Sequence, residues 1–302
     1  VELEGGYGGN LGDKLTGKVR QYGYFCKKSA QGSLLYYLKP VQPDYDMIWR
    51  LSNRKTVAVM LDEGLGSYTN TPLLWAKCIF LESGWKAGIL GAYRLLARNP
   101  LWRRALQRRG QLEEFVLLQY KEGHWLAKER VAEGYRKVLE QKAPPGDFSR
   151  YEGAVVINTD VSAEMGNIRE DEDIRALSLV CAWCGKRGVP VVLKPHPRER
   201  RLERYQGLAC TIETGGNGIA QELIFAGLSK KPLCTVSMFS TTLVSASVLY
   251  QVPGIALNRL LDERMISIRK NYEAANRLLA DFVSIPETEE ELERVLDSHI
   301  EI

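Results

Sequence analysis

Two adjacent carboxylates, Asp62 and Glu63, are the first residues whose placement suggests chemistry. They follow residues 56–61, a short apolar, β-branched run that is typical of a buried strand. Charge at the end of a buried strand needs a partner or a function. Because two neighbouring carboxylates resist ionising together, one of them suits a general base near neutral pH. The alternative is a helix cap in solvent, or a salt bridge to Arg50 or Arg54.

A second candidate is the stretch KPHPRE at residues 194–199, which follows another apolar run. A proline on each side of His196 restricts the backbone and holds the imidazole in place. Lys194, Arg198 and Arg200 are its cationic neighbours in the sequence. A fixed imidazole among cations suits an anion such as a phosphate. The alternative is an ordinary surface turn after a strand.

Hydroxyl groups and glycines mark two further turns. Ser240, Thr241 and Thr242 stand where a helix is predicted to begin, and hydroxyls beside the first N–H groups of a helix form an anion site. Ordinary helix capping is the alternative. Gly215 and Gly216 lie in a strand-to-helix turn that could bring backbone close to a ligand, although packing explains them equally well.

The surrounding pattern indicates the elements that must position these residues. Apolar runs typical of strands cover residues 56–61, 153–160, 189–197, 210–214, 232–237 and 253–258. Helical patterns cover residues 71–85, 99–110, 122–142, 171–188, 217–227 and 240–251. This alternation predicts an α/β fold with a parallel sheet that is covered on both faces. Ligands of such sheets bind beyond the carboxyl ends of the strands, where the candidate stretches fall.

Length and composition limit the remaining possibilities. A chain of 302 residues suits two domains of about 150 residues each. The Pro/Gly-rich stretch 143–147 predicts a boundary that gives domains 1–145 and 146–285, followed by a C-terminal helix over 286–302. The formal net charge of +4 fits an anionic ligand or a membrane surface and does not require nucleic acid.

Cysteine usage and hydropathy indicate the compartment. Six scattered cysteines suggest a reducing cytosol. Cys181 and Cys184 have redox-motif spacing, but they lie in a helical pattern without a second pair for zinc, which favours core packing. No apolar run reaches the roughly 20 residues of a membrane span. Because the sequence does not begin with Met, we expect that a segment precedes it. The basic stretch 98–110 is either a solvated helix face or a surface for anionic lipid or an acidic glycan.

The three motifs, taken in order, resemble those of the bacterial sialyltransferases and polysialyltransferases. The shared features are Asp-Glu-Gly at 62–64, His-Pro at 196–197 followed by Arg-Glu, and the hydroxyl residues at 240–242. The lipooligosaccharide sialyltransferase and capsular polysialyltransferase groups are the most similar. The resemblance implies a GT-B fold of two Rossmann-like domains with a cleft between them. It also implies transfer of sialic acid from CMP-sialic acid to a sugar hydroxyl, with the acid in the first domain and CMP in the second.

The resemblance further implies roles for individual residues. Glu63 would be the general base and Asp62 would orient the loop, although the two roles could be reversed. His196 would contact the phosphate of CMP, either as an acid or as a hydrogen-bond donor, and Ser240 and Thr241 would hold the same phosphate. The donor site would be completed by Lys194, Pro197, Gly215, Gly216 and Thr242, with the register among residues 240–242 left open.

The predicted protein is therefore an inverting, metal-independent glycosyltransferase with no cofactor beyond its CMP-sialic acid donor. Its acceptor would be a cell-surface glycan or glycolipid of a bacterial capsule or lipooligosaccharide, and nucleic acid is not an expected partner. It would be cytoplasmic, with peripheral contact to the inner membrane as an option. The alternatives are a GT-B enzyme that uses CMP-Kdo or a UDP-sugar, and a non-catalytic protein that binds a nucleotide or an anionic glycan.

Overall fold

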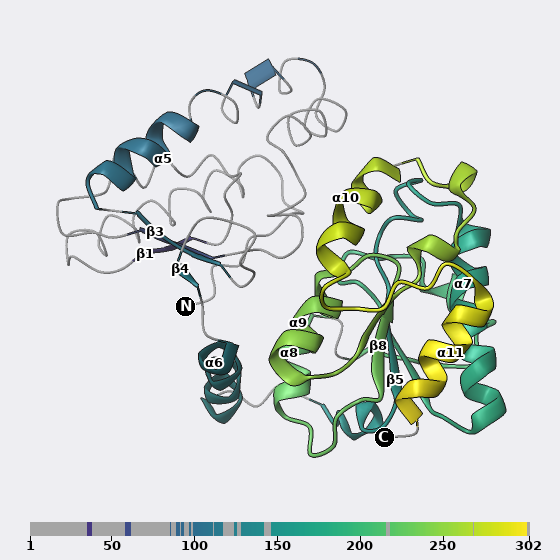
Figure 1. Ribbon diagram of the computed structural model, residues 1–302. Coiled ribbons are helices and arrows are strands. Elements are labelled where there is room, and N and C mark those ends of the chain that lie inside the picture. The colour runs from purple at the N-terminus through teal and green to yellow at the C-terminus, as the bar shows by residue number, and fades with distance from the viewer. Residues whose placement is uncertain are drawn as a thin grey trace. The chain divides into compact units, whose positions relative to one another are not determined.

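The chain forms two compact units, Val1–Leu126 and Ala127–Ile302. The computed structural model (Figure 1) describes residues 35–37, 58–61, 85, 89–90, 92–93, 97, 99–110, 112–116, 124–125, 128–141, 146–215, 218–267 and 269–300. Asp62, Glu63 and Gly216 lie outside these residues, as does the predicted helix 71–85 apart from Trp85. The predictions made for them, and the predicted domain boundaries, remain predictions.

The first unit contains a parallel sheet whose described strands follow the order β1-β2-β3-β4. These strands are β1 (Leu35–Tyr37), β2 (Ala58–Leu61), β3 (Leu112–Val116) and β4 (His124–Trp125), and helix α5 spans Asn99–Arg108. Val59 of β2 lies opposite Tyr36 of β1 and Glu113 of β3. Strand β2 confirms the strand predicted before the acidic pair, and its carboxyl end directly precedes Asp62 in the chain.

The second unit is built on a parallel sheet with the order β7-β6-β5-β8-β9. Its strands are β5 (Val155–Asn158), β6 (Val191–Lys194), β7 (Thr211–Ile212), β8 (Cys234–Ser237) and β9 (Gly254–Ala256). The chain starts at β5, builds outward to β7, then crosses to β8 on the other side of β5. Strand order thus reverses between β5 and β8, and ligands bind beside such a reversal in open α/β sheets.

Helices cover both faces of this sheet. The helices of the second unit are α6 (Lys128–Gln141), α7 (Glu170–Arg187), α8 (Gln221–Ala226), α9 (Thr241–Tyr250), α10 (Arg269–Leu279) and α11 (Glu289–Ile300), of which α6 packs on α8 and α9. Short 3-10 helices connect them: η2 (Ser149–Tyr151), η3 (Leu202–Tyr205), η4 (Asn258–Leu260) and η5 (Glu263–Met265). Helices α7, α10 and α11 contribute side chains to the core on one face of the sheet, and α8 and α9 to the core on the other. Figure 1 shows α7 and α8 on opposite sides of the strands. The predicted α/β fold with parallel strands covered on both faces is confirmed.

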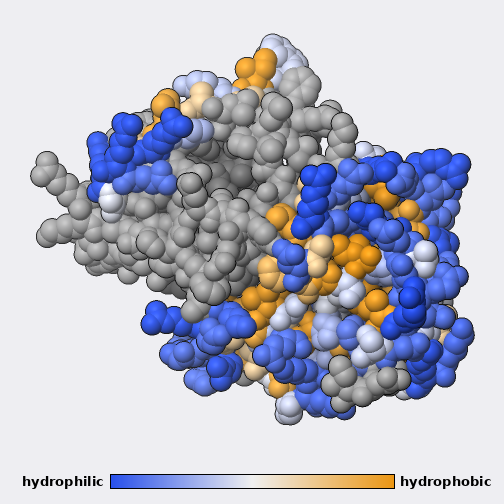
Figure 2. Space-filling model, viewed as in Figure 1, coloured by the Kyte–Doolittle hydropathy of each residue, from blue (hydrophilic) through white to orange (hydrophobic). Residues whose placement is uncertain are grey.

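Local sequence explains how these helices begin and end. Helix α7 has four acidic residues in its first turn and Lys186 and Arg187 in its last, which complements the helix dipole. It ends at Gly188 in the left-handed conformation, with a φ of 66°. Helix α9 contains no charged residue, and it packs between the sheet and helices α6 and α8. Figure 2 accordingly shows hydrophobic side chains around α8 and α9 and hydrophilic ones over α10 and α11. None of the described helices is both long and apolar enough to cross a membrane.

Gly254 brings β9 into close contact with its neighbours, which yields a test of the packing. A Cβ atom added there would lie 2.7 Å from Cγ1 of Val283 and 3.0 Å from the carbonyl oxygen of Leu243. We expect Gly254→Ala to lower the free energy of unfolding by about 1–3 kcal/mol, because neither neighbour has room to move in the core. Urea unfolding measures the change.

The control for this substitution is Gly185→Ala, in the interior of α7. A Cβ atom at Gly185 would meet no heavy atom within 4 Å. This variant should gain roughly 0.5–1 kcal/mol, because glycine weakens a helix interior. Equal effects of the two substitutions would contradict the packing described here.

Candidate functional site

The predicted site residues that the structure describes gather at the carboxyl edge of the second sheet. Lys194 ends β6 and is followed by His196 and Pro197, whereas Gly215 lies beyond β7. Ser240 caps α9 after β8, and Thr241 and Thr242 are the first two residues of that helix. Because β6 and β8 are the two neighbours of β5, the His-Pro turn and the hydroxyl turn flank the loop after β5. One sheet edge therefore carries both motifs.

His196 is half-buried and is fixed by three hydrogen bonds. Its backbone N–H donates to Oγ1 of Thr159 at 3.0 Å and to Oε2 of Glu199 at 3.3 Å. Its Nδ1 atom accepts from the backbone N–H of Arg198 at 3.1 Å. Nδ1 is therefore unprotonated, and the neutral ring carries its proton on Nε2. Burial lowers the pKa of His196, and the charges of Arg198 and Lys194 lower it further. The ring is thus a neutral hydrogen-bond donor near pH 7.

A buried charge network lies behind this histidine. The Glu199 side chain is fully buried and accepts hydrogen bonds from Nη2 of Arg204 and from the hydroxyl of Tyr205, both at 2.5 Å, and from Oγ1 of Thr159. The Arg204 side chain is also buried and pairs with Asp173 at 3.1 Å. Glu199 thereby connects the loop after β5 to the His-Pro turn.

Glu199 and Thr159 are functional residues that the sequence motifs do not identify. Residues 159–160 are polar and directly follow a buried strand. The same pattern makes Asp62 and Glu63 candidate site residues. That signal could have identified Thr159. Nothing local indicates that Glu199 folds back to contact it, because their hydrogen bond spans 40 residues.

The buried network around Glu199 contains more carboxyl groups than basic groups. Burial raises the pKa of Asp173 to about 7, an effect that outweighs the lowering by Arg204. Burial also raises the pKa of Asp160, although the carboxylate accepts a 2.7 Å hydrogen bond from the N–H of Ser162. Bound protons on these carboxyl groups therefore neutralise part of the negative charge of the cluster.

The hydroxyl turn forms the amino end of α9. Ser240 caps the helix, and its Oγ atom accepts from the N–H of Thr242 at 3.2 Å and lies 2.8 Å from Oγ1 of Thr242. Hydroxyls at the positive end of a ten-residue helix can bind an anion. Asn258 supports the hydroxyl turn, because its Nδ2 donates a hydrogen bond to the carbonyl of Met238 at 2.9 Å. Asn258 and Asn276 also exchange amide hydrogen bonds of 3.0 and 2.7 Å.

Lys194 is the last residue of β6 and is only 6% exposed. Strand alternation directs it to the face of Val192, which α8 and α9 cover. Burial lowers the pKa of Lys194, although Glu222 and Glu213 act in the opposite direction. Glu222 also accepts a 2.5 Å hydrogen bond from the hydroxyl of Ser245, in α9. The ammonium group of Lys194 is thus buried near two carboxylates, and direct contact with a donor remains a prediction.

The remaining predicted residues differ in what they offer a ligand. Pro197 is exposed beside His196. The N–H of Gly215 donates to Oε1 of Glu213 at 2.8 Å, so this amide serves the turn itself. Of the cations expected around the imidazole, Arg198 is exposed, whereas the N–H of Arg200 donates to Glu164 at 2.8 Å.

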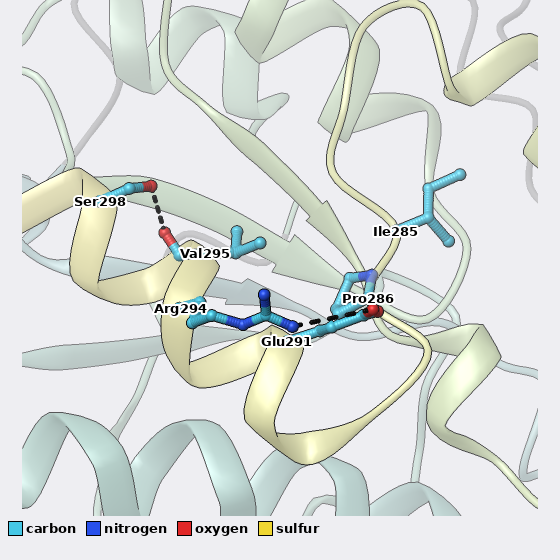
Figure 3. A pocket seen from close by; sticks show the side chains of 6 residues that line it. All are labelled: Ile285, Pro286, Glu291, Arg294, Val295 and Ser298. Atoms are coloured by element: carbon cyan, nitrogen blue, oxygen red, sulfur yellow. Dashed lines mark hydrogen bonds and ion pairs between the residues drawn. The ribbon is translucent and has the colours of Figure 1, made fainter.

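Two cavities of the second unit lie away from most of these residues. One, of about 320 Å³, is lined by Ile285, Pro286 and four residues of α11 (Figure 3). It contains none of the predicted site residues. The other, of about 200 Å³, is lined in part by Asn258, Tyr272 and Asn276 and so adjoins the support of the hydroxyl turn.

The contribution of Glu199 can be tested by Glu199→Gln. The change leaves Arg204 buried with one carboxylate fewer, so we expect a loss of about 3–5 kcal/mol in the free energy of unfolding. Chemical denaturation measures it. Glu203→Gln is the control, because that side chain is 63% exposed in its ion pair and should change stability by less than about 0.5 kcal/mol. Similar losses in both variants would exclude a special role for Glu199.

The raised pKa of Asp173 predicts a pH dependence of stability. Between about pH 4 and pH 7 the folded protein keeps a proton that the unfolded chain has released, so stability falls as the pH rises through this window. The slope for one proton is at most about 1.4 kcal/mol per pH unit. Asp173→Asn should flatten this slope in urea unfolding.

The control for Asp173→Asn is Asp171→Asn. Arg169 holds the pKa of Asp171 below its ordinary value, so this carboxylate is ionised in both states across the window. Its replacement should leave the slope unchanged. An unchanged slope in Asp173→Asn would overturn the assignment of the bound proton.

The sequence of the chain resembles that of a known protein family. A family model described as alpha-2,8-polysialyltransferase (POLYST) matches residues 35–259. No curated protein gives a significant match. A crystal structure described as the glycotransferase of kitacinnamycin aligns over 88% of this chain and 89% of that one, with 12% identity and a TM-score of 0.40. A likeness at this level carries no argument about the reaction.

Proposed function

Because the chain belongs to the alpha-2,8-polysialyltransferase family and is therefore a glycosyltransferase, we propose that it transfers sialic acid, or a related nonulosonic acid, from a CMP-activated donor to a hydroxyl of a cell-surface glycan. The observation that best supports this is the pairing of His196 with the start of α9 on either side of β5. Both lie at the same edge of the sheet, and both carry groups that can donate hydrogen bonds.

In this proposal the second unit binds the phosphate of CMP. The Nε2–H of His196 donates to a phosphate oxygen, and Ser240 and the first turn of α9 bind the same group. Charge accumulates on this phosphate as the bond to the anomeric carbon breaks, so donors already in place stabilise the transition state. The lowered pKa of His196 supports a role as a neutral donor instead of an acid.

The acceptor hydroxyl loses its proton to a carboxylate, for which Glu63 is the proposed base and Asp62 its neighbour. The acceptor oxygen then attacks the anomeric carbon, the bond from that carbon to the phosphate oxygen breaks, and its electron pair leaves with CMP. A single displacement of this kind inverts the anomeric centre. The position of β2 directly before Asp62 supports a strand-end location for this pair. The proposed reaction uses no metal or cofactor.

The direct test incubates the full chain with CMP-sialic acid and a short sialyl acceptor. We expect release of CMP and elongated products, detected by chromatography and mass spectrometry, with inversion followed by NMR. His196→Ala should lower kcat/KM on the order of 10²-fold, because one donor to the developing charge is lost. Turnover of a UDP-sugar in place of the CMP-sugar would overturn the proposed donor, and binding of CMP without turnover of any acceptor would overturn the proposed catalysis.

A matched pair of hydroxyl deletions separates the site from general effects. Ser240→Ala removes a hydroxyl at the proposed phosphate site and should lower kcat/KM. Ser298→Ala removes one on α11 that bonds only locally, to the carbonyl of Val295 at 2.7 Å, and should leave kcat/KM unchanged. Since Ser240 also caps α9, thermal unfolding must show that the variant is folded at the assay temperature. Equal activities would remove Ser240 from the proposed site.

A further inference from the structure

Residues 85–111 of the first unit, which we call the basic segment, have an unusual charge composition. They include seven of the 41 Lys and Arg residues of the chain and none of its 37 Asp and Glu residues, so their net charge is +7. The rest of the chain, with 34 basic and 37 acidic residues, has a net charge of −3. The positive charge of the whole protein therefore comes from this one segment.

Helix α5 presents part of this charge on a single face. Leu106 is fully buried, and α5 packs against β3. Leu101, Arg104 and Arg108 are three and four residues apart, which places them together on one face, and all three are exposed. Because successive residues turn by about 100° around an α-helix, Leu106 points away from that face. The helix is thus anchored by Leu106 and exposes an aliphatic and basic face.

Large apolar side chains are exposed along the rest of the basic segment. The exposed fraction is between 48% and 61% for Trp85, Ile89, Leu90 and Tyr93, all of which have helical backbone. With Leu101, which is 66% exposed, they are five of the seven large apolar side chains exposed in the described part of the chain. Figure 2 shows hydrophobic side chains next to the hydrophilic ones of α5, at the border of the first unit where Figure 1 labels that helix. Such a concentration marks an interaction surface.

The chemistry of this surface distinguishes among anionic partners. Arginines attract any polyanion. Aliphatic side chains such as Ile89, Leu90 and Leu101 neither donate nor accept hydrogen bonds, and a glycan or a nucleic acid would leave much of their surface in water. The boundary between the headgroups and acyl chains of a bilayer would remove these side chains from water, which is favourable. Trp and Tyr side chains such as those at 85 and 93 are also typical of the headgroup level.

We propose that the basic segment docks on the surface of an anionic phospholipid bilayer. Arg104 and Arg108 lie among the headgroups, and Leu101 inserts beside them toward the acyl chains. Ile89 and Leu90 add to the inserted apolar surface. The docking does not depend on the proposed glycosyl transfer, so it can be tested without a donor or an acceptor.

Co-sedimentation of the full chain with vesicles tests the proposal. Phosphatidylcholine vesicles that contain about 30% phosphatidylglycerol should bind the chain, and vesicles of phosphatidylcholine alone should bind it far more weakly. The double variant Arg104→Gln/Arg108→Gln should bind the anionic vesicles roughly 30-fold more weakly, because each arginine near such a surface contributes about fivefold. Leu101→Gln should weaken binding roughly 10-fold through the loss of apolar burial.

The control is Lys186→Gln/Arg294→Gln, which removes the same charge from the second unit. Its side chains are 70% and 75% exposed, and it should bind as the wild type does. Two measurements on the wild type need no variant to fold. Raising the salt from about 0.05 M to about 0.5 M should release the chain, because the Debye length shortens. Bromine on the acyl chains should quench tryptophan fluorescence, because the apolar face inserts.

Several results would overturn the inference. They are equal binding to the two kinds of vesicle, equal losses in the α5 variant and its control, and tryptophan fluorescence that bound brominated vesicles do not quench. Retention on an acidic polysaccharide or nucleic acid column would also overturn it, if the α5 variant abolishes that retention and the wild type binds no vesicle. The surface would then serve a polyanion in solution.

Discussion

The buried carboxylate of Glu199 is the interaction on which the candidate site depends. A fully buried carboxylate is tolerated only when hydrogen bonds and an opposite charge surround it. Here Arg204 supplies the charge, while Thr159 and the backbone of His196 supply hydrogen bonds from two neighbouring loops. The charge is satisfied only when these loops adopt this arrangement. The interactions that stabilise the buried carboxylate of Glu199 therefore also hold the imidazole of His196 in place.

The buried network neutralises its own charges, and a different set of groups is available to a ligand at the sheet edge. The acids of the cluster are compensated internally, by Arg204 and by bound protons, so they do not need the ligand for their neutralisation. The groups at the sheet edge are the amino end of α9 and a neutral imidazole, whose Nδ1 accepts a backbone hydrogen bond and whose Nε2–H is left as a donor. An anion at this edge would meet oriented donors instead of mobile counterions, and preorganised donors of this kind stabilise developing charge best.

Much of the second unit could be predicted from its sequence because its signals are local. Buried parallel strands are continuous apolar runs, and the helices between them carry charge bias, caps and terminal glycines, so strands such as β5 and β8 were placed closely. The motifs could be placed at strand ends for the same reason. The partners of those motifs could not, since the contact of Glu199 with Thr159 and the burial of Lys194 depend on strand order.

The order of the five strands has a consequence for synthesis. The hydroxyl turn rests on Asn258, which follows the last strand, and Asn258 in turn is held by Asn276 in α10. During translation the residues 194–199 leave the ribosome long before this support exists. A chain interrupted after residue 250 would contain every motif of the second unit and still lack the buried amides that hold the amino end of α9. The ability to bind an anion there must therefore arise late, when roughly the last sixth of the polypeptide has docked.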